Sequence, residues 1–227
     1  MKMVRIASSQ GSKVAALVAM TLGGIGFISV ANAALITPGQ TINNPPGLAV
    51  YGGVAVFPST TTPFIGTSVL GAAFTGELTS TVYSDPANVF GAGDYDFVYQ
   101  FSNDNNPNND AIENFSINGF GGYSTNADYS AGSNVAPVQI TRLAPSLGDV
   151  INYYFGSTSG VPYSKSSDQL VIQTNATSYQ FGTASLQDGG TARISAPVPS
   201  VPEPATFAIA SFAVCALGMR RRAASKA

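Results

Sequence analysis

Few residues of this chain can take part in catalysis. The 227 residues include no histidine, and the one cysteine is Cys215. Without histidine, the chain has no Ser-His-Asp or Cys-His nucleophile activation, no imidazole ligand for zinc and no histidine general base. Cys215 lies inside a C-terminal apolar run, so the rest of the chain has no thiol for a disulfide or a thiolate metal site. Phosphate-binding glycine motifs are also missing from the sequence.

Carboxylates are the remaining catalytic candidates. A glycosidase needs only two acids at a suitable separation, and Asp94 with Asp96 or Asp149 with Asp168 can be drawn as such a pair. Asp94 and Asp96 stand beside a glycine-rich turn, where acids more simply keep the end of a strand soluble. We therefore expect a protein that is not an enzyme, and a histidine-free polysaccharide hydrolase is the least favoured alternative.

A cation site is the second chemical possibility. Residues 103–110 (NDNNPNND) are entirely polar apart from one proline, and Asp104 and Asp110 with their asparagine neighbours supply oxygen atoms. Ca²⁺ takes six to eight oxygen ligands, so these two acids are candidate calcium ligands. The segment lacks the ligand order of an EF-hand loop, and the simpler interpretation is a solvated loop without a cofactor.

The charge of the central region limits its partners. Residues 34–200 contain eleven acidic and three basic residues, a net charge of −8, whereas the whole chain carries −2. Binding to phosphate groups requires lysine and arginine, so this charge argues against nucleic acid as a partner.

The pattern of residues 34–194 predicts an all-β fold. Short β-rich runs alternate with clusters of Gly, Asn, Asp, Ser and Pro, and no helical period is visible. The length fits one domain, which we expect to be a single antiparallel β-sandwich of the jelly-roll type. The predicted strands are residues 48–57, 76–84, 95–101, 111–120, 135–142, 149–155, 168–174, 178–182 and 184–194, the last with a turn at residues 188–190.

The clearest strand is residues 95–101 (YDFVYQF). Its aromatic residues recur with period two, which places Tyr95, Phe97, Tyr99 and Phe101 on one face. Such a stripe can stack on sugar rings, but it more often faces a core, which is what we expect here. Together with residues 111–120 this strand resembles a hairpin closed by the polar loop.

Three further segments are predicted to be irregular. Residues 58–63 (PSTTTP) are expected to form a turn, and residues 121–134 a long crossing loop. From Ser195 onwards, proline recurs at every second or third position. We expect residues 195–204 to form a semi-rigid linker.

The N-terminus has the features of a secretory signal peptide. Basic residues precede an apolar stretch, and Ala31 and Ala33 form an A-x-A site before Ala34. We therefore expect residues 1–33 to be removed on export.

The C-terminus combines three features. Val201, Pro202, Glu203 and Pro204 are followed by the uncharged run 205–219 and then by a basic cluster. The prolines prevent a helix from continuing backwards, so a helix is expected to start at Ala205. We expect residues 205–219 to form a short transmembrane helix and residues 220–227 to lie on the cytoplasmic side. The run is shorter than the roughly 20 residues that span a bilayer comfortably, which suits a temporary anchor. The basic cluster is Arg220, Arg221 and Arg222.

This C-terminal arrangement resembles the PEP-CTERM sorting signal of Gram-negative bacteria. The resemblance covers residues 201–227, about an eighth of the chain. It implies an exosortase as processing partner, a transient anchor in the inner membrane, and export to the cell envelope or the extracellular polysaccharide. Residues 95–104, 113–120 and 170–189 are also similar to the exported β-sandwich domains that precede such signals.

The sequence thus predicts a non-enzymatic, exported cell-surface or matrix protein associated with exopolysaccharide. The open alternative is a binding module for carbohydrate or for calcium-dependent adhesion.

Overall fold

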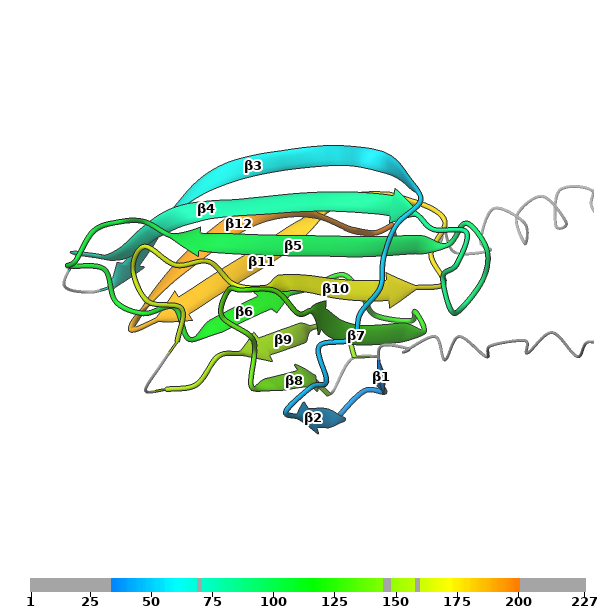
Figure 1. Ribbon diagram of the computed structural model, residues 1–227, viewed down its shortest axis with the longest axis horizontal. Helices are drawn as coiled ribbons and strands as arrows, with labels where there is room; N and C mark the ends of the chain where they lie inside the picture. Colours follow the sequence, from blue (N-terminus) through cyan, green and yellow to red (C-terminus); the bar gives the residue numbers. More distant parts are fainter. Residues whose placement is uncertain (1–33, 69–70, 145–147, 158–159, 201–227) are drawn as a thin grey trace, which may run out of the picture. The chain divides into compact units, whose positions relative to one another are not determined.

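The structure is a computed structural model, and it describes residues 34–68, 71–144, 148–157 and 160–200. In this part of the chain every regular element is a β-strand, and no helix is present, so none could cross a membrane. Figure 1 shows the strands along the chain. They are β1 (Ala34–Leu35), β2 (Thr41–Asn43), β3 (Val54–Ser68), β4 (Gly71–Ser84), β5 (Tyr95–Asn103), β6 (Asn114–Ile117), β7 (Thr125–Ser130), β8 (Gln139–Arg142), β9 (Ile151–Tyr154), β10 (Gln169–Thr174), β11 (Tyr179–Asp188) and β12 (Gly190–Pro199).

All strands belong to one antiparallel hydrogen-bonded sheet. Its order is β1-β7-β10-β5-β4-β3-β12-β11-β6-β9-β8-β2. β3 pairs with β12 through one residue pair, Thr67 with Thr191. The two halves of the sheet described next are therefore connected by very few paired residues. We call β1, β7, β10, β5, β4 and β3 the first half of the sheet, and the remaining six strands the second half.

The sheet curls so that its two halves face each other. The Tyr99 hydroxyl in β5 donates a hydrogen bond of 2.5 Å to the carbonyl of Pro197 in β12. From the second half, the Tyr153 hydroxyl in β9 donates to the carbonyl of Val171 in β10, at 3.0 Å. Burial raises the pKa of both tyrosines well above the ordinary value, so both hydroxyls stay protonated as donors.

An aromatic core fills the space between the halves. The rings of Tyr99 and Phe115 lie 5.5 Å apart, and Phe101 contacts both Phe115 and Phe155. These four side chains are at most 1% exposed. Aromatic pairs at such separations contribute about 0.5–1.5 kcal/mol beyond the area that they bury. The all-β prediction and the core role of the aromatic strand are therefore confirmed.

The predicted turn at residues 58–63 is wrong, because β3 runs through it. β3 pairs with β4 on one side, while residues 58–63 have no partner from β12 on the other. Proline lacks a backbone N–H and is tolerated on such an open side or at a bulge. The register shifts between Phe57 and Thr60, on either side of Pro58.

The predicted hairpin of residues 95–101 with 111–120 is also wrong. β5 pairs with β4 and β10, whereas β6 pairs with β11 and β9. Loop 104–113 therefore passes from one half of the sheet to the other (Figure 1). Within the predicted crossing loop 121–134, residues Thr125–Ser130 form β7, which pairs with β10.

The predicted end of the all-β domain at residue 194 is wrong. β12 continues to Pro199, and residues 195–199 pair with residues 179–183 of β11, with Ala196 and Val198 buried. The alternating prolines at 197 and 199 leave every second N–H free for the ladder, so this stretch is strand where a linker was expected. The predicted signal peptide (residues 1–33) and the predicted tail (residues 201–227) lie outside the described residues.

Candidate functional site

A polar surface covers the solvent side of the second half of the sheet. Side chains alternate along each strand, so the inner positions supply the core and the outer positions face water. The register aligns the outer positions into two rows across the strands. The first row is Thr41, Thr141, Asn152, Ser116, Ser185 and Arg193; the second is Asn43, Gln139, Tyr154, Asn114, Gln187 and Thr191.

We call these twelve residues the outer polar face. All of them are exposed or half-buried. Eleven are uncharged, and eleven carry a hydroxyl or an amide group, the exception in both respects being Arg193. Neighbouring strands lie about 4.8 Å apart, so the face repeats polar groups at that spacing in one direction.

Hydrogen bonds hold part of this face in order. The Ser116 hydroxyl donates to Oδ1 of Asn152 at 2.8 Å, and Nε2 of Gln139 donates to Oδ1 of Asn43 at 2.8 Å. The hydroxyls of Thr41 and Thr141 are 3.1 Å apart. Side chains ordered in this way lose less conformational entropy when a ligand binds.

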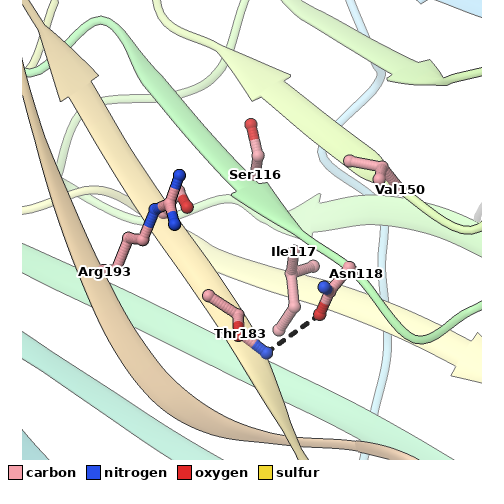
Figure 2. Close-up of a pocket in the computed structure, with 7 residues that line it drawn as sticks. Ser116, Ile117, Asn118, Val150, Thr183 and Arg193 are labelled. Atoms are coloured by element: carbon pink, nitrogen blue, oxygen red, sulfur yellow. Dashed lines mark hydrogen bonds between the residues drawn. The ribbon is translucent and has the colours of Figure 1, made fainter.

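A groove of about 320 Å³ opens at one end of the face. Figure 2 shows Ser116, Thr183 and Arg193 around it, contributed by β6, β11 and β12. Asn118 continues the wall, and its Oδ1 accepts a 2.9 Å hydrogen bond from the backbone N–H of Thr183. The side chain of Arg193 is exposed, and its guanidinium donates to no residue of the described ranges, so it is available to a ligand.

An aromatic cluster lies next to the groove. The outer side of β11 carries Phe181, Thr183 and Ser185. Because Thr183 lines the groove, Phe181 lies beside the groove, two residues along the strand. Its ring lies 5.7 Å from that of Phe57, and Tyr179 is 5.6 Å from Phe57. Phe181 is 60% exposed. A polar groove beside an exposed ring has both contact types of a sugar-binding surface, hydrogen bonds and ring stacking.

The predicted acid pairs do not form an open site. Asp96 is fully buried, and its Oδ1 accepts a 2.8 Å hydrogen bond from Nδ2 of Asn88. Asp149 accepts from the backbone N–H groups of Gly119 and Gly121, at 2.9 and 3.2 Å. Asp168 is 3% exposed and accepts from the N–H of Asn134. The carboxylates of Asp149 and Asp168 therefore stabilise loops by accepting hydrogen bonds from backbone N–H groups.

The candidate calcium ligands lie in the loop after β5. Asp104 is exposed, and its backbone N–H donates to the carbonyl of Thr75 at 2.9 Å. The backbone N–H of Asp110 donates to the carbonyl of Ala73 at 3.0 Å. Among the described residues no three acidic, histidine or cysteine side chains are grouped so as to hold a metal. Calcium binding by Asp104 and Asp110 stays a prediction.

Sequence reasoning missed the outer polar face. A signal for it was present, because Ser, Thr, Asn and Gln alternate with apolar residues in NFSIN, QIT and ASLQ. The alternation shows which side chains face water, but only the strand order shows that they form continuous rows.

Comparisons with protein-family models, with curated proteins and with solved structures found no match to this chain.

Proposed function

We propose that this chain is a non-enzymatic exported protein that binds extracellular polysaccharide through its outer polar face. In this proposal the facing halves act as a β-sandwich domain, delivered by the signal peptide and processed by an exosortase at the PEP-CTERM-like tail. The domain then works at the cell surface or in the polysaccharide matrix of a Gram-negative bacterium.

The observation that carries the proposal is the pair of polar rows across six strands. Hydroxyl and amide groups both donate and accept hydrogen bonds, as the hydroxyls of a sugar do. A surface that repeats such groups suits a polymer that repeats its own hydroxyls, since weak contacts add up along the chain.

The charge of the domain favours a neutral polysaccharide. Residues 34–200 carry a net charge of −8, and Arg193 is the one cation on the outer polar face. An acidic polymer would be repelled over most of the surface, whereas a neutral chain meets no such cost. Arg193 then acts as a hydrogen-bond donor to sugar oxygens and Phe181 as a stacking surface.

The test is binding of the mature domain to polysaccharide from the producing cells, measured by calorimetry. The variant Ser116→Ala/Asn152→Ala/Ser185→Ala removes three adjacent members of the first row. Because each hydrogen bond contributes about 0.5–1.5 kcal/mol, we expect binding to weaken at least tenfold.

The matched control is Thr61→Ala/Thr79→Ala, which removes a hydroxyl pair 2.9 Å apart on β3 and β4, in the first half of the sheet. It should bind like the unchanged protein. Equal binding by the triple variant and the unchanged protein would contradict the proposed face.

A further inference from the structure

A pair of acidic side chains is buried at one end of the first half of the sheet. Asp96 in β5 is fully buried, and Asp85, directly after β4, is 5% exposed. Both lie in a polar cluster that includes Asn88 and Gln173, which are 7% and 3% exposed. The outer polar face lies on other strands, so this pair is a separate feature.

The hydrogen bonds leave one buried oxygen of Asp96 without a donor. Oδ1 of Asp96 accepts from Nδ2 of Asn88, and Oδ1 of Asp85 accepts from the backbone N–H of Ala87 at 2.8 Å. Oδ2 of Asp96 is buried and has no hydrogen-bond partner among the described residues. The backbone N–H of Asp85 donates to the carbonyl of Asp94 at 3.0 Å, so Asp85 lies opposite Asp94 and is a diagonal neighbour of Asp96 on the same face. A proton on one of the two carboxyl groups would supply the donor that this arrangement lacks.

Within the described ranges, no cation lies beside the pair to balance two negative charges. The three basic residues of these ranges are on other elements: Arg142 in β8, Lys165 in loop 160–168 and Arg193 in β12. The nearest titratable groups are further acids and phenols. Tyr83 is the strand partner of Asp96. Tyr51 belongs to residues 47–53, which we call the crossing segment, and its ring contacts that of Tyr83. Asp94 is two residues before Asp96 in the chain.

Protonation agrees with this geometry. Burial, together with the adjacent Asp85 carboxyl, raises the pKa of Asp96 to about 8. A calcium ion is a poorer occupant, because the amide of Asn88 and the N–H of Ala87 already use one oxygen of each acid. The two remaining oxygens fall short of the six to eight that calcium takes.

The pair sits where two surface segments meet the sheet. The carbonyl of Asp85 accepts from the N–H groups of Gly93 and Asn88, which closes loop 85–94. The crossing segment is attached beside it, since Nε2 of Gln173 donates to the carbonyl of Val50 and Gly53 packs against Ser84. Repulsion between two charged acids would therefore act on both segments.

We propose that Asp85 and Asp96 share one proton and form a pH-dependent lock that holds loop 85–94 and segment 47–53 on the sheet. With the proton in place the carboxyl–carboxylate contact closes the cluster. When the proton leaves in alkaline medium, the two charges repel each other and the loop loosens.

The sign of the stability change follows from proton binding. An unfolded aspartate loses its proton near pH 4, whereas buried Asp96 keeps its proton to about pH 8. Between these values the folded state binds more protons, so stability falls as pH rises and levels off above about pH 8. The unfolding equilibrium constant should grow by up to about tenfold per pH unit in this window.

The experiment compares the unchanged chain with Asp96→Asn by denaturant unfolding at pH 5, 6.5, 8 and 9.5. The amide that this substitution introduces can donate to Asp85 as the proton does, so the variant should not show the loss between pH 5 and 8. Asp85→Asn should behave similarly, and Asp104→Asn, which alters an exposed acid, should follow the unchanged protein.

A second measurement keeps the proposal falsifiable if the variants fold poorly. Infrared difference spectra of the unchanged protein should show a carboxylic acid carbonyl band at pH 7 that disappears by pH 9.5. Exchange of the Asn88 and Gly93 amides, corrected for intrinsic rates, should accelerate over the same range. The proposal is overturned if that band is missing, if Asp96→Asn retains the full pH dependence, or if calcium restores the stability lost by pH 8.

Discussion

Arg142 shows how one buried charge can organise three separate loops. Its side chain is 3% exposed and donates to the carbonyls of Gly148, Ile36, Phe120 and Tyr123, and to the hydroxyl of Thr125, at 2.6–3.0 Å. Desolvation lowers the pKa of Arg142, and the nearby Asp149 partly offsets this effect. The planar guanidinium reaches all five acceptors at once because its donors point in fixed directions.

Replacing Arg142 with lysine should destabilise the fold strongly. A lysine has three donors on one nitrogen and leaves several buried carbonyls without a partner, each costing about 1–3 kcal/mol. We expect Arg142→Lys to lose at least about 3 kcal/mol of unfolding free energy, measured by denaturant titration.

The control for this substitution is Arg193→Lys, on the exposed outer polar face, which should lose less than about 0.5 kcal/mol. Similar losses in the two variants would show that the buried network of Arg142 contributes little.

At the scale of the element, the crossing segment 47–53 explains how the first half of the sheet is covered. It lies over the outer side of β5 and β10, where Ala49 packs with Val98 and Val171 in a small second core. The N–H groups of Gly47 and Leu48 donate to Asp128 at 3.1 and 3.0 Å. The segment ends at Gly53, directly before β3, and Gly53 has a φ of 88°.

Gly53→Ala should detach this end of the segment. A Cβ at position 53 would lie 2.1 Å from the backbone oxygen of Ser84, and the φ also disfavours alanine. We expect a loss of about 1–3 kcal/mol and faster amide exchange at residues hydrogen-bonded to the segment.

Gly189→Ala is a suitable control, because its φ is also positive but nothing lies within 4 Å of the added Cβ. It should lose only about 1 kcal/mol. An equal loss in the two variants would show that backbone conformation, and not contact with Ser84, accounts for the effect at Gly53.

Strand periodicity predicted the elements better than it predicted their partners. The aromatic strand, the turn near Gly189 and the strand of residues 76–84 follow from local patterns of alternation and glycine. The pairing of β6 with β11, and of β12 with β3, depends on contacts between segments far apart in the chain, which local patterns do not encode. For the same reason the rows of the outer polar face were not predicted.

At the scale of the whole molecule, the proposed function joins a β domain with export signals at both ends of the chain. The tail carries three consecutive arginines after an apolar run. In the proposed sorting these hold the run in the inner membrane until processing.

Replacing Arg220, Arg221 and Arg222 with glutamine should therefore impair retention and processing. The expected result is accumulation of unprocessed chain, or its premature loss from the membrane, followed by immunoblots of cell fractions. Lysine at the same three positions keeps the charge and is the matched control. Normal maturation of the glutamine variant would contradict a sorting role for this cluster.

The most direct test of the proposed function is the intact mass of the protein eluted from washed extracellular polysaccharide of the producing cells. We predict a chain that begins at Ala34 and lacks the residues beyond the Pro202-Glu203-Pro204 region. Recovery from the membrane fraction alone, with residues 205–227 still attached, would contradict both processing at the tail and association with the matrix.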